Sequence, residues 1–108
     1  MSVQYLFNSY GDWIAFRKGE FVFDTDGNWL GWLPWGDLEI VDVSGEYLGT
    51  IESDRLYRFK NRPYRGYPGH SDSPDYPGYP GYPDHPGCSL LPSFAEDINI
   101  AKLERSKR

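Results

Sequence analysis

Short apolar runs alternate with polar, turn-forming residues along the first 60 positions of the chain. Runs rich in aromatic and β-branched residues are typical of strands, and clusters of Asp, Asn and Gly are typical of turns. No segment before residue 90 has convincing helical periodicity. The pattern therefore predicts an all-β meander of about seven short antiparallel strands. They are expected near residues 3–8, 12–16, 20–24, 28–33, 38–42, 46–51 and 55–60.

Three of the predicted turns repeat nearly the same sequence. The common form is Asn/Asp-x-x-Gly-x-Trp/Tyr-Leu/Ile-Gly/Ala, and it begins at Asn8, Asp24 and Asp42. Asp or Asn at the first position of a type I turn accepts bonds from backbone N–H groups, and a glycine three residues later supplies a left-handed conformation. Each repeat is therefore predicted to be one β-hairpin. Such repeats build a shared core, either as a small barrel or as a flower-like arrangement of hairpins around an axis.

The last residue of each repeat is small: Ala15, Gly31 and Gly49. Glycine weakens a strand, so inside one it normally marks a bulge or a close approach of another backbone. We expect crowding where the hairpins meet, or a neighbouring ring that lies flat over the strand. A ligand over the glycine is the less favoured alternative.

The composition changes abruptly at Arg62. Residues 62–92 hold eight of the nine prolines, and Tyr-Pro-Gly recurs at Tyr67, Tyr76 and Tyr79. Proline lacks the N–H needed for sheet pairing and forces the residue before it to be extended. Residues 62–92 are therefore predicted to be a Pro/Gly/Tyr-rich linker that follows a β-hairpin repeat domain at residues 1–61. The alternative is an adhesive segment, whose tyrosines lie along the sheet, on a neighbouring subunit or in a partner's groove.

A short amphipathic helix is predicted over residues 93–104. Ser93 and Glu96 fit a capping box, in which the serine caps the first turn and the glutamate reaches back. Phe94, Ile98 and Ala101 would share one helical face. We expect this face to dock on its own domain or on a neighbouring chain rather than on a membrane.

Length and charge restrict the class of protein. The chain of 108 residues is one domain at most, and a folded part of about 60 residues is small enough to favour oligomerisation. The net charge of −5 argues against nucleic acid as a partner. The single cysteine, Cys88, excludes a disulfide within the monomer. A cytoplasmic location is expected, because we find neither a membrane-spanning hydrophobic run nor a secretory signal.

No set of residues has the pattern of a catalytic, cofactor or metal site. Asp24–Asn28 begins like a calcium loop, but Trp29 and Trp35 stand where that loop needs Gly and Glu. The two histidines and Cys88 fit no zinc spacing. The sequence has no nucleophile elbow and no phosphate-binding loop. We therefore expect a protein that is not an enzyme and that holds no cofactor and no metal.

The best candidate binding surface is an aromatic cluster formed by Trp29, Trp32, Trp35 and Tyr47. Trp29 and Trp35 are expected on one face of a strand and Trp32 on the other, so that one face belongs to the core. The other face would be covered by the tail, the helix or a subunit partner. The leading expectation is a scaffold or interaction module that self-associates or binds a protein partner through aromatic faces. The alternative is a glycan-binding or small-molecule-binding module that uses these rings.

The string from Phe21 to Trp32, its weaker copy at residues 39–51 and the Pro-Gly-aromatic segment that follows resemble the four-fold beta flower family of uncharacterised bacterial proteins. The resemblance implies β-hairpins around an approximate four-fold axis, and it brings no established activity. Three repeats are clear and residues 55–59 supply half of a fourth, so the symmetry is either internal or produced by assembly. Weaker resemblances are to choline-binding cell-wall repeats and to PRC-barrel domains, which are also small β-meanders.

Overall fold

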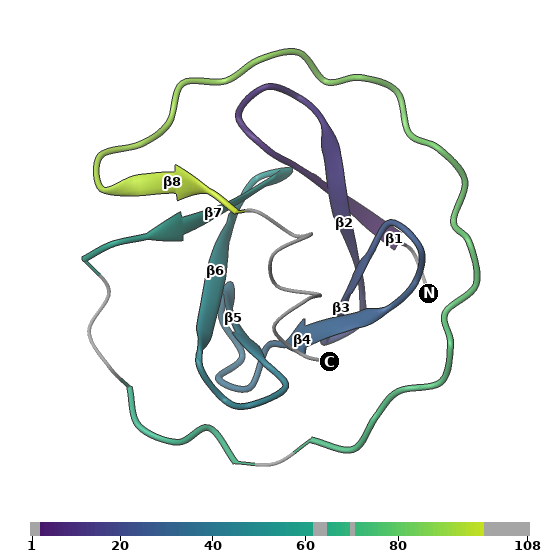
Figure 1. The fold of residues 1–108 in the computed structure, drawn as a ribbon, viewed down its shortest axis with the longest axis vertical. Helices are drawn as coiled ribbons and strands as arrows, with labels where there is room; N and C mark the ends of the chain where they lie inside the picture. The colour runs from purple at the N-terminus through teal and green to yellow at the C-terminus, as the bar shows by residue number, and fades with distance from the viewer. Residues whose placement is uncertain (1–2, 62–64, 70, 99–108) are drawn as a thin grey trace.

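The computed structural model describes residues 3–61, 65–69 and 71–98. All strands in these residues belong to one sheet and follow one another in chain order: β1 (Val3–Phe7), β2 (Trp13–Lys18), β3 (Phe21–Asp24), β4 (Trp29–Trp32), β5 (Glu39–Asp42), β6 (Tyr47–Glu52), β7 (Arg55–Phe59) and β8 (Ala95–Asp97). Consecutive strands are antiparallel, and a parallel contact between β1 and β7 closes the first seven into a barrel (Figure 1). The predicted seven-stranded meander is confirmed, and β8 is an additional strand.

The repeated sequence forms the turns that its Asp and Gly residues predict. In the second turn, the Asp24 N–H donates to the Asn28 carbonyl at 2.9 Å, and the Gly27 N–H donates to the Asp24 carbonyl at 3.1 Å. The Asp24 carboxylate also accepts the N–H groups two and four residues ahead, both at 2.9 Å. Asn8 and Asp42 accept the equivalent bonds in the first and third turns. The turn glycines have φ between +87° and +93°, which is why the sequence needs glycine there.

The fourth hairpin consists of β7 and β8, which are far apart in the sequence. Phe59 pairs with Ala95, and the Lys60 N–H donates to the Phe94 carbonyl at 2.7 Å, as Asp24 does to Asn28 in the second turn. The proline-rich segment is therefore the loop of the fourth hairpin, and it runs around the outside of the other three before it returns to β8 (Figure 1). All four hairpins of the arrangement thus belong to one chain.

The helix predicted over residues 93–104 is wrong in its described part. Residues 93–94 form a turn and residues 95–97 form β8, and no helix occurs in the described ranges. Phe94 has φ of +65°, which a right-handed helix does not accept. Pairing with the open edge of β7 also satisfies the backbone groups of β8, so tertiary context overrides the local helix signal. The predicted residues 99–104 lie outside the described part of the chain.

The buried residues form two layers. A central cluster fills the barrel with aliphatic side chains, and its members are Leu6, Ala15, Val22, Leu30, Leu33, Ile40, Leu48, Ile51 and Leu56. Adjacent strand residues face opposite sides of a sheet, yet Val22 and its neighbour Phe23 are both buried. Phe16, also buried, stacks on Phe23 with ring centres 5.4 Å apart. The outer face of β2 and β3 is therefore covered at Phe16 and Phe23.

Candidate binding surface: an aromatic belt on the hairpin turns

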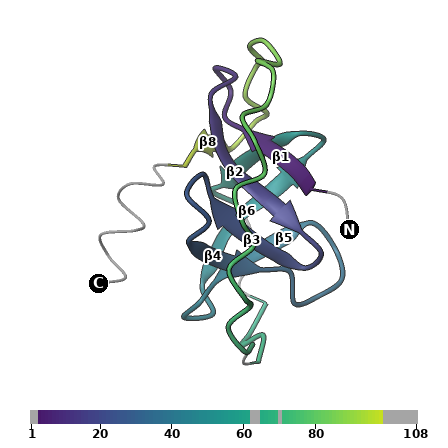
Figure 2. The same ribbon diagram turned by 90° about the vertical axis from the view of Figure 1, so that its right-hand side faces the viewer.

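The described residues of the proline-rich segment lie against the outside of the barrel (Figures 1 and 2). We call residues 65–69 and 71–94 the belt; it forms the green outer ring in Figure 1 and crosses the edge of the barrel in Figure 2. Its described residues contain neither helix nor strand. The belt connects β7 to β8, as a linker would, and it also contacts every one of the three repeated turns. The alternative in which tyrosines lie along the sheet is therefore the arrangement within this chain.

Side chains of the belt lie against the turn glycines at intervals of nine residues. The three contacts are Tyr67 on Gly45, Tyr76 on Gly27 and His85 on Gly11. Each of the three belt residues is followed by Pro-Gly. A β-carbon at Gly27 would lie 2.5 Å from the Tyr76 ring, so the turn glycine is needed for this contact as well as for its own conformation. Nine residues further on, Phe94 closes the fourth hairpin. The belt thus advances one step for each hairpin.

Sequence reasoning recognised Tyr-Pro-Gly as a repeat but missed its nine-residue period. The signal was present in the sequence, because an aromatic ring recurs at positions 67, 76, 85 and 94. The additional motif at Tyr79 and the replacement of tyrosine by His85 obscured it. The pairing of each step with one turn glycine depends on the path of the belt, which only the structure gives.

A cluster of rings holds the belt between the first and second turns. The ring centre of Trp13 lies 5.4 Å from that of Tyr82, 5.7 Å from that of Tyr5 and 6.0 Å from that of Tyr79. Trp13 also packs on the buried Phe16, with centres 6.4 Å apart, so the cluster connects the belt to the outer core layer. Edge-to-face ring pairs of this kind stabilise by about 0.5–1.5 kcal/mol each beyond their buried area.

Two barrel side chains bind the carbonyl groups of belt prolines in the same region. The Tyr5 hydroxyl donates to the Pro80 carbonyl at 2.8 Å, and Lys18 Nζ donates to the Pro77 carbonyl at 3.4 Å. Aromatic rings combined with donors to proline carbonyls are the usual means by which proteins recognise extended proline-rich segments. The barrel therefore binds its own belt through the same kinds of contact that other proteins use to bind proline-rich ligands.

An ion-pair cluster fixes the start of the belt. The Arg65 guanidinium lies 4.2 Å from the ring centre of Trp35, and its Nη1 donates to Asp37 at 2.7 Å and to Glu39 at 2.9 Å. The backbone N–H of Glu39 is the main cause that lowers the pKa of Asp37, and the Arg65 hydrogen bond lowers this pKa further. Hydrogen bonds to the two carboxylates raise the pKa of Arg65. The side chains are partly exposed, so solvent screens the attraction.

The four residues predicted as a binding cluster are each half-buried in the structure: Trp29, Trp32, Trp35 and Tyr47. Among the described residues, no aromatic ring contact joins any two of them. Trp29 donates its Nε1–H to the Gly31 carbonyl at 2.9 Å. The Tyr47 hydroxyl shares a bond with Thr50 and accepts the Phe59 N–H. Trp35 has Arg65 over its ring.

Most of the highly exposed tyrosines lie instead on the belt. Tyr67, Tyr76, Tyr79 and Tyr82 are between 61% and 78% exposed although each contacts the barrel. No group of three or more His, Cys, Asp or Glu residues in the described part of the chain could hold a metal ion. A search of the same residues finds no helix long and apolar enough to cross a membrane.

These features define a class of small β-barrel in which four hairpins are encircled by the loop of the last one. The family model of the 4-fold beta flower protein matches residues 4–91, and the chain belongs to this family. The match covers the hairpin repeats and most of the belt, which confirms the resemblance found in the sequence. Comparisons with curated proteins and with solved structures found no match.

Proposed function

We propose that this protein is a non-enzymatic interaction module that self-associates through the aromatic faces of its belt. The observation that carries the proposal is the exposure of Tyr79 and Tyr82, at 61% and 78%, beside the half-buried Trp13. Contiguous exposed apolar surface marks interaction sites, and tyrosine is enriched at the centres of interfaces. The barrel already orders the backbone under these rings, which lowers the entropic cost of binding a partner.

Charge and location support a protein partner. The chain carries a net charge of −5, which disfavours phosphate backbones and anionic lipid surfaces. The proposal places the protein in the cytoplasm. The glycan-binding alternative needs an open ring face, and it draws less support from a Trp35 ring that faces Arg65. That alternative stays a prediction, and a sugar that protects the tryptophans from acrylamide quenching would favour it.

Light scattering coupled to size-exclusion chromatography tests the proposal over a range of protein concentrations. The variant Tyr79→Ser/Tyr82→Ser should weaken self-association about tenfold or more, because two aromatic contacts are lost on each copy. Tyr10→Ser is the matched control, since Tyr10 is 67% exposed and makes none of the Trp13 ring contacts. A wild-type protein that stays monomeric at millimolar concentration would contradict the proposal. So would a double variant that associates as the wild type does.

A further inference from the structure

We propose that the first hairpin turn is an exchangeable docking site for a Tyr-Pro-Gly segment supplied by a second copy of this chain. In the structure, His85-Pro86-Gly87 of the same chain occupies the site. The inference rests on the proposed interaction function and names the chemistry of the partner. It begins from a difference among the three turns, two of which hold tyrosine while the first holds histidine.

The tyrosine in the second turn makes a hydrogen bond to the barrel. The Tyr76 hydroxyl donates to the Asp26 carbonyl at 3.2 Å. Asp26 is the third residue of its repeat, and the equivalent residue of the first turn is Tyr10. Among the described residues, the Tyr10 carbonyl accepts only a weak contact from the Cys88 thiol, at 3.6 Å. A tyrosine seated on the first turn would therefore have a carbonyl to which its hydroxyl can donate.

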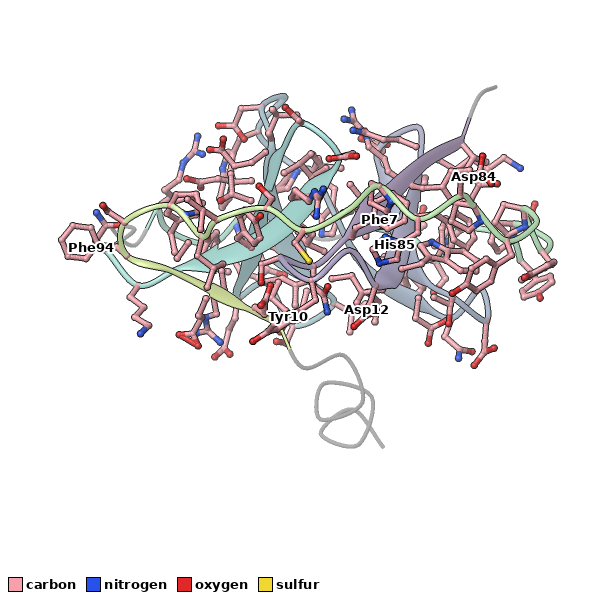
Figure 3. The ribbon with its side chains drawn as sticks, turned by 90° about the horizontal axis from the view of Figure 1, so that it is seen from above. Phe7, Tyr10, Asp12, Asp84, His85 and Phe94 are labelled. Carbon is pink, nitrogen blue, oxygen red and sulfur yellow. The ribbon has the colours of Figure 1, made fainter. Side chains whose placement is uncertain are left out.

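His85 does not use that carbonyl. Its Nδ1 accepts the Gly87 N–H at 3.0 Å, which is a bond within the belt and not to the barrel. Its ring nevertheless fills the space that a tyrosine ring fills in the second turn, 2.5 Å from where a β-carbon of Gly11 would lie. Figure 3 shows His85 alongside Tyr10 and Asp12, the two neighbours of Gly11. The first turn thus holds an aromatic side chain with fewer bonds to the barrel than its counterpart in the second turn.

The belt is also loosely held on either side of His85. Asp84, Cys88 and Ser89 are exposed, and Leu90 is 95% exposed. The Ser89 N–H donates to the Ser9 carbonyl at 2.7 Å, which is the one backbone bond from residues 84–91 to the barrel among the described residues. Segments with few buried apolar contacts open at low free-energy cost. This arc can therefore leave the first turn while the anchors at the other two turns remain in place.

A second copy offers a suitable segment. Tyr-Pro-Gly occurs at Tyr67, Tyr76 and Tyr79, and the first two rings already occupy turn glycines of their own chain. Tyr79 packs on Trp13 and is 61% exposed. Tyr79-Pro80-Gly81 is therefore the copy of the motif that a neighbouring chain can present to the first turn. Docking of this segment would replace His85 by the residue type that the other turns accept.

A labelled peptide with the sequence of residues 76–84 tests the site, with fluorescence anisotropy on the full-length protein as the readout. The wild-type belt competes at an effective concentration on the order of millimolar, so wild-type binding should be weak. His85→Ala empties the site and should tighten binding about tenfold, whereas His85→Tyr fills it and should weaken binding about tenfold. A peptide with serine in place of its tyrosines should not bind.

Two glycine variants in the His85→Ala background locate the docking site. Gly11→Ala places a β-carbon where the incoming ring must lie and should abolish binding. Gly36→Ala is the matched control, because Gly36 has a similarly left-handed φ of +74° and open space around its β-carbon position. Equal loss of binding in both variants would overturn the inference. If Gly11→Ala does not fold, the comparison of His85→Ala with His85→Tyr and the serine peptide decides the same question.

The inference fails if His85→Ala binds no peptide or binds the serine peptide equally well. In that case, self-association that still depends on Tyr79 and Tyr82 would leave the proposed function intact. Conversely, a monomeric wild-type protein whose His85→Ala variant binds the tyrosine peptide would refute self-association and with it the second copy as the occupant, while the first turn would still be a binding site for Tyr-Pro-Gly. The two failures are therefore distinguishable.

Discussion

The buried carboxylate of the second turn should contribute more to stability than its half-buried counterpart in the third. Asp24 is 2% exposed, and its carboxylate accepts two backbone N–H groups and the side-chain amide of Asn28, at 2.9–3.0 Å. Asp42 accepts the two equivalent backbone groups at 2.9 and 3.1 Å, but water reaches its turn. The variants Asp24→Ala and Asp42→Ala therefore remove the same turn hydrogen bonds at two positions that differ in burial.

Burial sets the size of the expected difference. Alanine at position 24 leaves two backbone donors of a part-buried turn without their acceptor, which should cost about 2–4 kcal/mol. Alanine at position 42 leaves donors that water can satisfy, so only the net value of the bonds is lost, about 1 kcal/mol. A small domain has a free energy of unfolding of about 5–15 kcal/mol, so Asp24→Ala would remove a large part of it.

Urea unfolding followed by tryptophan fluorescence measures both losses, provided that the slope with denaturant is unchanged between variants. Asp24→Asn is an internal check, because the amide oxygen can still accept the two backbone bonds, and its loss should be smaller than that of Asp24→Ala. Equal losses of unfolding free energy for Asp24→Ala and Asp42→Ala would refute the reasoning, since burial would then not determine how much the turn hydrogen bonds contribute to stability.

Three further predictions address packing and charge. Gly31→Ala should destabilise by about 3 kcal/mol in urea, because its β-carbon would collide with a carbonyl oxygen of β5; a loss below about 0.5 kcal/mol, within the range of a neutral surface change, would contradict this. Arg65→Met should raise the pKa of Asp37 toward 3.8 without reaching it, because the hydrogen bond from the Glu39 N–H, the main cause of the lowered pKa, remains. In the wild type this stabilisation exists above pH 3.8 and is lost as the pH falls through the lowered folded-state pKa, which an NMR titration of both proteins detects. Tyr57→Phe should be neutral or stabilising by up to about 1 kcal/mol in thermal unfolding, because the buried hydroxyl has no hydrogen-bond partner among the described residues.

Much of the barrel follows from local chemistry and could be read from the sequence. The spacing of Asp24 and Gly27 predicts the turn, because a type I turn followed by a left-handed residue needs both. The alternation of apolar residues predicts the strands, because one face of each must be buried. The crowding expected at Gly31 is present, where a β-carbon would meet the backbone of Val41. These features depend on interactions within a few residues or between neighbouring strands.

The fourth hairpin could not be predicted in the same way. Its partners, Phe59 and Ala95, are separated by the whole belt, and the segment that forms β8 has stronger local signals for a helix. The surroundings of the predicted binding residues depend on the tertiary structure for a related reason. Whether Trp35 faces solvent or Arg65 depends on where the belt begins its path, and no local pattern records that path.

The sequence by itself determined three hairpins, strands with a buried apolar face and an extended tyrosine-rich segment, because turn geometry, strand alternation and the conformation of proline are local properties. Only the tertiary structure decided that this segment is the loop of a fourth hairpin and that its aromatic rings meet one turn glycine every nine residues. That register is a match between two repeats distant in the chain. The register exists because the belt is wrapped around a closed barrel. The distance from one hairpin to the next sets the number of belt residues between two contacts.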